Sequence, residues 1–278
     1  MLYQKNGQAI DKLAISIEDR AFMYGDGCFT TARWSNGKII LWERHLQRFK
    51  HAIAALQLQC SLERIEQEAK LFIAQLVNES YGTIKIVLSR GISARGYALP
   101  DTVCDLYFYF YPAQTLQQPQ TIAQIGLMPE NLGTSMASLK GVKTLNRLEQ
   151  VILKAQAEKN HWSEALCFDQ QQHLVEAISS NCFLYIDGQW ITPNLTLAGI
   201  AGTMRQEILS RMQHYQIKHQ VRIIAQAEIA QAEALFLCNA LQPMSMVHQV
   251  VNVQAQVQQL SIEPCQQLFS QLSLHQLV

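Results

Sequence analysis

Residues 141–150 read Gly-Val-Lys-Thr-Leu-Asn-Arg-Leu-Glu-Gln and place Lys143 between apolar neighbours, just ahead of a helical pattern. Apolar residues then recur at helical spacing and predict a helix over about 146–160, whose apolar face holds Leu145, Leu148, Val151, Ile152 and Ala155. A lysine at a helix start is ordinarily just solvated. An apolar setting would lower the pKa of this amine, because burial disfavours the charged form, and a neutral amine is a nucleophile and a base.

Two further segments carry the other parts of a cofactor site. Glu176 follows a turn at 169–173 and precedes a strand, so its carboxylate is either an exposed strand-end group or part of a site. Residues 199–205, Gly-Ile-Ala-Gly-Thr-Met-Arg, predict a glycine-rich turn that either caps a helix or binds an anion. Pyridoxal phosphate needs an amine for its aldehyde, an acid for its ring nitrogen and N–H donors for its phosphate. The three segments supply these groups.

In this order the segments resemble the fold-type IV pyridoxal phosphate enzymes, which include branched-chain and D-amino-acid aminotransferases and 4-amino-4-deoxychorismate lyases. The resemblance covers roughly residues 19–247. The family pattern of lysine, then Ser, His or Thr, Leu and Asn, fits Lys143 better than its rival Lys140. A second pattern, Thr/Ser-Glu-x-x-x-x-Asn-x-Phe, is matched at residues 176–183, and only Val175 departs from it.

The resemblance implies which residues bind the cofactor. Lys143 would form the Schiff base, and the Glu176 carboxylate would meet the pyridinium nitrogen through a charge-assisted hydrogen bond. Arg48 matches the phosphate-binding arginine, although by itself it could equally belong to a basic helix face. Further cofactor contacts are implied, in the glycine-rich turn and near residue 240, for Gly202, Thr203, Met204, Asn239 and Ala240.

The N-terminal segment favours the lyase branch. Transaminases of this fold tend to show Tyr-Gly-x-x-x-Phe-Glu-Gly, whereas residues 25–33 read Gly-Asp-Gly-Cys-Phe-Thr-Thr-Ala-Arg, which resembles the lyases. The loop 89–97 adds two arginines, each either solvated or able to hold a substrate carboxylate bidentately. Thr30 or Thr31 would position the substrate or pass a proton to it. The implied substrate contacts are Tyr24, Phe29, Arg90 and Arg95.

The implied reaction converts 4-amino-4-deoxychorismate to 4-aminobenzoate and pyruvate, a step towards folate, in a homodimer. Lys143 would release the cofactor to the substrate amine and then remove the proton from the amine-bearing ring carbon. Two alternatives stay open. One is a D-amino-acid or branched-chain aminotransferase, which shares Lys143 and Glu176; the other is an inactive cofactor-carrying protein.

The composition agrees with an enzyme that acts on a small molecule. Of 278 residues, 49% are hydrophobic and 16% are charged, and Lys+Arg and Asp+Glu number 22 each, so no net field attracts nucleic acid or a membrane. The seven scattered cysteines form no Cys-x-x-Cys pair and indicate neither a disulfide framework nor a metal site, which suits the cytoplasm. The charged first twenty residues predict no signal peptide, and no apolar run predicts a membrane span.

We expect a two-domain α/β protein, and the resemblance places the cofactor in the interdomain cleft. The predicted N-terminal α/β domain covers residues 1–113, a polar Pro-bounded linker covers 114–120, and the pyridoxal phosphate domain covers 121–278. Helices are predicted at 43–56, 61–77, 146–160, after 203 and from 261. Beyond short N-terminal strands, strands are predicted at 27–34, 38–42, 83–88, 104–111, 122–128, 164–168, 174–177, 182–186, 217–224, 234–237 and 244–250.

Overall fold

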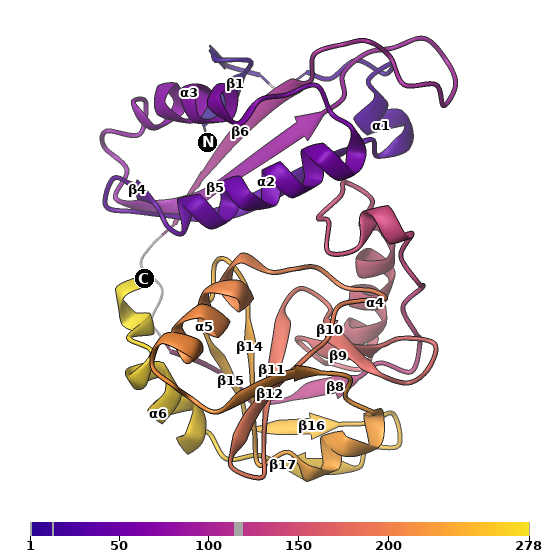
Figure 1. Cartoon of the computed structure of the whole chain (residues 1–278), viewed down its shortest axis with the longest axis vertical. Helices are drawn as coiled ribbons and strands as arrows, with labels where there is room; N and C mark the ends of the chain where they lie inside the picture. The colour runs from indigo at the N-terminus through magenta and orange to yellow at the C-terminus, as the bar shows by residue number, and fades with distance from the viewer. Residues whose placement is uncertain (1, 13, 114–118, 278) are drawn as a thin grey trace. The chain divides into compact units, whose positions relative to one another are not determined.

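The computed structural model describes residues 2–12, 14–113 and 119–277 and divides into two compact units (Figure 1). The first unit contains Met1–Thr115 and Val142–Asn146, and the second contains Leu116–Gly141 and Arg147–Val278. The short segment that carries Lys143 therefore belongs with the first unit, although the chain on both sides of it belongs to the second. The predicted linker lies largely outside the described residues, and the predicted domain boundaries stay predictions.

The first unit is a six-stranded antiparallel sheet of order β2-β1-β6-β5-β3-β4 with two long helices. Alternate strand residues such as Ile84, Ile86 and Phe108 pack against Phe49 and Phe72 of these helices and form the core. The elements are β1 (Leu2–Lys5), β2 (Gln8–Ile10), α1 (Arg20–Tyr24), β3 (Gly27–Ser35), β4 (Lys38–Ile39), α2 (Trp42–Leu56), α3 (Leu62–Ile73), β5 (Tyr81–Ser89) and β6 (Asp105–Pro112).

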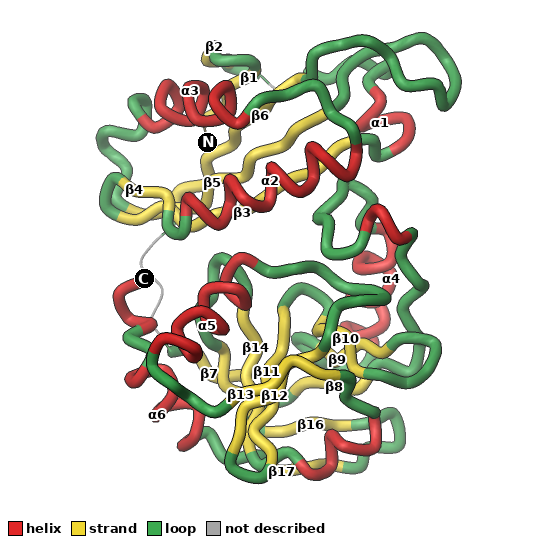
Figure 2. Tube along the Cα trace, viewed as in Figure 1, coloured by secondary structure: helices red, strands yellow, loops and turns green. Residues whose placement is uncertain are grey.

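The second unit contains two sheets, of order β10-β9-β8-β16-β17 and β13-β12-β11-β14-β15-β7 (Figure 2). Apolar side chains from both sheets form a shared core. Its strands are β7 (Gln120–Ile122), β8 (Ile125–Leu127), β9 (Ala165–Phe168), β10 (Leu174–Ala177), β11 (Asn181–Ile186), β12 (Gln189–Pro193), β13 (His219–Arg222), β14 (Ala234–Cys238), β15 (Ser245–Val247), β16 (Gln249–Val251) and β17 (Val257–Gln259). Its helices are α4 (Leu148–Lys159), α5 (Thr203–His214) and α6 (Glu263–Gln271), with short 3₁₀ turns at Ala137–Leu139, Gln226–Gln231 and Leu274–Leu277.

The predicted α/β class is confirmed, and three predicted strands are corrected. The strand predicted at 38–42 ends at Ile39, because the chain turns there and Trp42 begins α2. The predicted strand 122–128 is β7 followed by β8, and the predicted strand 244–250 is β15 followed by β16. β7 pairs with β15 in one sheet, whereas β8 pairs with β16 in the other. In the latter two cases the chain leaves one sheet and joins the second, so a single apolar run becomes two strands. Helix α1 was not predicted from the sequence.

The helix after Lys143 also differs from its prediction. It begins at Leu148 and not at about residue 146, with Arg147 as its N-cap, after Lys143 and Leu145 have formed hydrogen bonds with β3. The predicted apolar face is wrong: Leu148 and Val151 are exposed, whereas Leu153 and Ala157 are buried. Among the described residues, no helix has the length and apolar character needed to cross a membrane.

Candidate functional site

Lys143 lies on an extended segment that pairs with the beginning of β3. The Phe29 N–H donates to the Lys143 carbonyl at 3.1 Å, and the Leu145 N–H donates to the Gly27 carbonyl at 3.1 Å. The Lys143 Nζ lies 4.6 Å from the centre of the Phe29 ring, a distance typical of a cation–π contact. A Cβ at Gly27 would collide with the Leu88 carbonyl of the neighbouring strand β5 and would also press on the Leu145 side chain, so this packing requires glycine at position 27.

Thr30 and Thr31 point to opposite faces of the sheet, because side chains alternate along a strand. Thr30 is fully buried, and its Oγ1 lies 2.6 Å from His45 Nδ1 and accepts a hydrogen bond from Arg48 Nη1 at 3.1 Å. Thr31 shares the Phe29 side of β3 and is partly exposed. Of the two threonines, Thr31 therefore lies on the side of the strand where the Lys143 amine contacts Phe29.

The pair of His45 and Arg48 carries one positive charge at neutral pH. Burial, with a smaller contribution from the Arg48 charge, lowers the pKa of His45 to about 3, so this imidazole is neutral. Burial lowers the pKa of Arg48 to about 10, which still leaves the guanidinium protonated. Arg48 is partly buried, and a cation whose neighbour is neutral suits an anionic group such as a phosphate. His45 was not singled out from the sequence, since a histidine on an apolar helix face gives no signal of its own.

In the second unit, Glu176 lies on β10 and is buried. Its Oε2 accepts a hydrogen bond from the Ile200 N–H at 2.9 Å and a longer one, 3.4 Å, from Asn181 Nδ2. Asn181 Nδ2 also donates to the Ile200 carbonyl at 3.0 Å. The carboxylate is thus oriented by the strand that follows it and by the glycine-rich turn.

The Arg147 side chain was not predicted as part of the site, yet its charge interacts with Glu176. Burial lowers the pKa of Arg147, and the carboxylates of Glu176 and Glu149 partly offset this effect. Arg147 stands four residues after Lys143 in the quoted stretch, but sequence spacing alone gives no sign that it faces a carboxylate from residue 176.

The first turn of α5 has the features of a phosphate site. Gly202 is the N-cap and has no side chain that could accept a hydrogen bond from the first N–H groups of the helix. A Cβ at this position would collide with Asn181 Oδ1. Thr203 and Met204 are each 1% exposed, and Thr203 Oγ1 is buried without a hydrogen-bond partner among the described residues. A buried hydroxyl without a partner is costly, and a phosphate at this helix N-terminus would satisfy it together with the first N–H groups. These residues therefore fit the phosphate of the cofactor that the sequence suggests.

Asn239 forms a turn of its own. Its Nδ2 donates to Ser180 Oγ at 3.0 Å, and its Oδ1 accepts from the N–H groups of Leu241 and Gln242, both at 3.0 Å. The turn also contains Ala240, which is partly exposed. The cofactor contacts predicted for Asn239 and Ala240 stay predictions.

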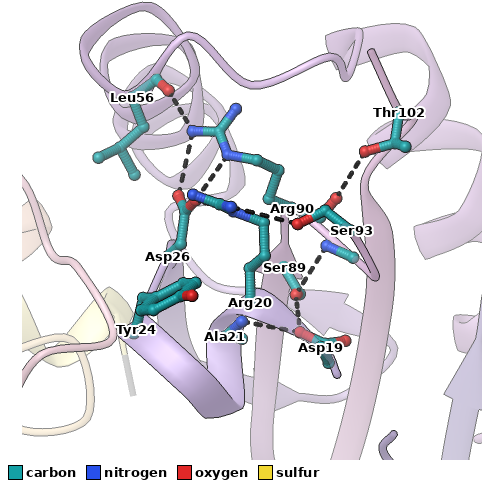
Figure 3. Close-up of polar contacts among 12 residues, drawn as sticks. Asp19, Arg20, Ala21, Tyr24, Asp26, Leu56, Ser89, Arg90, Ser93 and Thr102 are labelled. Carbon is teal, nitrogen blue, oxygen red and sulfur yellow. Dashed lines mark hydrogen bonds and ion pairs between the residues drawn. The ribbon is translucent and has the colours of Figure 1, made fainter. Parts of the chain in front are cut away.

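The predicted substrate residues of the first unit differ in their surroundings, and Figure 3 shows Arg90 and Tyr24 among their neighbours. Arg90 is 3% exposed and donates to the Asp26 carboxylate and to the carbonyls of Leu56 and Gln57. Its guanidinium is thus engaged inside the unit, whereas Arg95 is exposed in the loop that follows β5. The Tyr24 hydroxyl accepts a hydrogen bond from the Gly96 N–H at 3.3 Å in the same loop. Of the two arginines, Arg95 is the one accessible to a substrate.

Comparison with known proteins relates this arrangement to characterised chains. The family model described as amino-transferase class IV matches residues 27–250. An aminodeoxychorismate lyase from Vibrio harveyi is 32% identical over 230 residues, which are 82% of this chain and 84% of that protein. A D-alanine aminotransferase from Bacillus licheniformis is 23% identical over 84% of this chain and 82% of its own length. The structure of 4-amino-4-deoxychorismate lyase from Pseudomonas aeruginosa superposes with a TM-score of 0.85 at 30% identity and covers 98% of both chains.

Proposed function

Because the chain belongs to the amino-transferase class IV family, whose enzymes depend on pyridoxal phosphate, we propose that it is a lyase that converts 4-amino-4-deoxychorismate to 4-aminobenzoate and pyruvate. The observation that carries this proposal is the likeness to lyases from Vibrio harveyi and Pseudomonas aeruginosa, at 32% and 30% identity over most of the chain. D-alanine aminotransferases match at 23–26%. Residues 25–33, whose Thr30-Thr31 replaces the Glu-Gly of the transaminase pattern, point the same way.

The residues described above would supply the groups that this chemistry needs. Bound pyridoxal phosphate supplies an aldehyde for the substrate amine and a ring that accepts electrons. We assign to Lys143 the amine that holds this aldehyde and later removes the proton from the amine-bearing carbon of the substrate. Glu176 would accept a hydrogen bond from the ring nitrogen, and Arg48 and Thr203 would bind the phosphate with the first N–H groups of α5. Arg95 would hold a substrate carboxylate.

Thr31 is the better candidate for delivering a proton, since it lies on the Phe29 side of β3. We expect Thr31→Ala to lower kcat by about 10²-fold, the usual scale for a lost acid–base group, with little change in thermal stability. Thr30→Ala is the matched variant one residue away. Because it removes a buried hydroxyl that binds His45 and Arg48, it should lower the melting temperature and weaken cofactor binding. Steady-state kinetics and thermal unfolding of both variants test the assignment, which fails if Thr30→Ala has the larger loss of kcat at full cofactor loading.

A lyase regenerates the aldehyde form of its cofactor in every turnover, whereas a transaminase does not. We therefore expect the protein to release 4-aminobenzoate and pyruvate in equal amounts from enzymatically made 4-amino-4-deoxychorismate, without any 2-oxo acid acceptor. Both products can be followed in one reaction, by fluorescence and by lactate dehydrogenase coupling. If product forms only after an acceptor is added, or if D-alanine or leucine is turned over faster, the protein is an aminotransferase.

The cellular setting follows from the same proposal. We propose that the enzyme is a homodimer, that it acts in the cytoplasm and that its product serves folate synthesis. The lyase name of the Vibrio relative and the balanced charge of the chain support this setting. Sedimentation of the purified protein tests the dimer.

A further inference from the structure

Asp26 lies at the centre of a cluster of charged side chains in the first unit (Figure 3). Its Oδ2 accepts hydrogen bonds from Arg20 Nε at 2.8 Å and Arg90 Nε at 2.7 Å, and its Oδ1 accepts one from Arg90 Nη2 at 3.0 Å. The Arg20 and Arg90 side chains are only 5% and 4% exposed. Buried charges are stable only when they are paired and hydrogen-bonded, so removal of the carboxylate would leave two buried cations without their main partner.

The cluster is anchored to the rest of the unit. Arg90 also donates to the carbonyls of Leu56 and Gln57 at the end of α2, at 2.6 and 2.9 Å. A second carboxylate, Asp19, is 1% exposed and accepts a hydrogen bond from Ser89 Oγ at 2.5 Å. With two arginines and two aspartates the cluster has no net charge, which makes its burial tolerable.

Arg20 connects Asp26 to the loop that carries Arg95. Its Nη1 donates to Ser93 Oγ at 3.2 Å and to the Gly96 carbonyl at 3.0 Å, one on each side of Arg95. The Arg20 guanidinium also lies 5.0 Å from the centre of the Tyr24 ring. The residues around Arg95 are therefore held by the same guanidinium that binds the Asp26 carboxylate.

The backbone on either side of Asp26 holds the Lys143 segment. The Gly25 carbonyl accepts a hydrogen bond from Asn146 Nδ2 at 3.1 Å, and the Gly27 carbonyl accepts one from the Leu145 N–H at 3.1 Å. The Asp26 carbonyl itself accepts from the Arg90 N–H at 3.1 Å. Asp26 thus stands at the junction between the Arg95 loop and the segment that carries the lysine.

We infer that Asp26 is a positioning residue that fixes the Arg95 loop and the Lys143 segment relative to each other. In the lyase we propose, this would set the distance between the arginine that holds a substrate carboxylate and the amine that removes the proton. The role of Arg95 rests on the proposed function, whereas the mechanical link rests only on the contacts of the first unit. Two measurements that do not depend on enzyme activity can therefore test the link even if the substrate is not the one proposed.

The test uses holoprotein with Asp26→Asn, Arg20→Gln and a matched control, Arg64→Gln. Arg64 pairs with Glu68 at 2.8 Å and also donates to the Cys104 carbonyl, so the control removes a comparable ion pair elsewhere in the unit. Arg95 is the only trypsin site between residues 91 and 139. We expect trypsin to cut native Asp26→Asn after Arg95 about tenfold faster or more than wild type, and deuterium exchange of the 142–147 backbone to accelerate by a similar factor. Neither rate should change in the control.

The combination of the two rates decides the inference. If Asp26→Asn loosens only the loop or only the 142–147 backbone, or changes neither beyond the control, the inferred link is wrong. Arg20→Gln keeps Asp26 and Arg90 but removes the tie to the loop, so it should accelerate cleavage alone, and it remains informative if Asp26→Asn does not fold. In the lyase assay, Asp26→Asn should raise KM about tenfold when it is the only substitution. It should raise KM little when Arg95→Gln is already present. Additive effects on KM would mean that Asp26 does not act through Arg95.

Discussion

Replacement of Lys143 by alanine is expected to reduce turnover by roughly 10⁴-fold or more, the scale seen when a covalent catalytic residue is removed. In the proposed lyase, one amine would both hold the cofactor and move the proton. Lys85 on β5 also lies over the Phe29 ring, with its Nζ 5.1 Å from the ring centre, but only Lys143 lies in the segment that matches the family's lysine pattern. Borohydride reduction of the wild-type holoprotein, followed by peptide mapping, should place the pyridoxyl label on Lys143.

Lys140 provides the matched control, since it lies three residues earlier beside a 3₁₀ turn. Lys140→Ala should retain the label and should change turnover only a few-fold. A label found on Lys140, or a Lys143→Ala protein with near-normal turnover, would contradict the assignment.

The second large effect is expected for Glu176→Gln, with turnover lowered by about 10²-fold or more while cofactor remains bound. Glutamine keeps the size of the side chain and an oxygen for the Ile200 N–H, so the turn that leads into α5 should persist. What would be lost is the negative charge that, in the proposed site, keeps the ring nitrogen protonated and the ring a strong electron acceptor. Absorbance of bound cofactor and steady-state kinetics on the same samples separate binding from turnover.

A buried carboxylate with a different environment serves as the control. Glu164 accepts hydrogen bonds from the N–H and Oγ of Ser179 at 3.1 and 2.6 Å, and burial raises its pKa. Glu164→Gln should therefore lower stability somewhat but leave kcat within a few-fold. A fully loaded Glu176→Gln protein that turns over as fast as Glu164→Gln would refute the role of Glu176.

The sequence predicted elements whose signals are local. The helix predicted at 43–56 and the strands predicted at 27–34 and 104–111 are confirmed as α2, β3 and β6, because each segment packs according to its own pattern. The prediction of the buried face of α4 is wrong, because an apolar stripe in the sequence does not show which side of a helix the rest of the chain covers. Similarly, an apolar run does not show that a strand changes sheets, as between β7 and β8.

In the candidate site, too, local motifs predicted some residues, whereas others depend on contacts between distant segments of the chain. Motif spacing singled out Lys143, Glu176 and the first turn of α5, but it left Thr30 and Thr31 undecided. That choice depends on which face of β3 is covered by α2, a contact between separate segments. The burial of Arg90 depends likewise on Asp26 and on the end of α2, so its position could not be read from the loop sequence.

The division of the chain between the two units has a consequence for the order of folding. Residues 142–146 complete the first unit, yet the ribosome adds them only after the chain has already entered the second. At ordinary rates of synthesis this delay is roughly 1–5 s, during which the Gly27 carbonyl and the Phe29 N–H lack the partners that Leu145 and Lys143 will provide. An uncovered strand edge is prone to mispairing, so the nascent chain is vulnerable there until the lysine-bearing segment arrives and closes it.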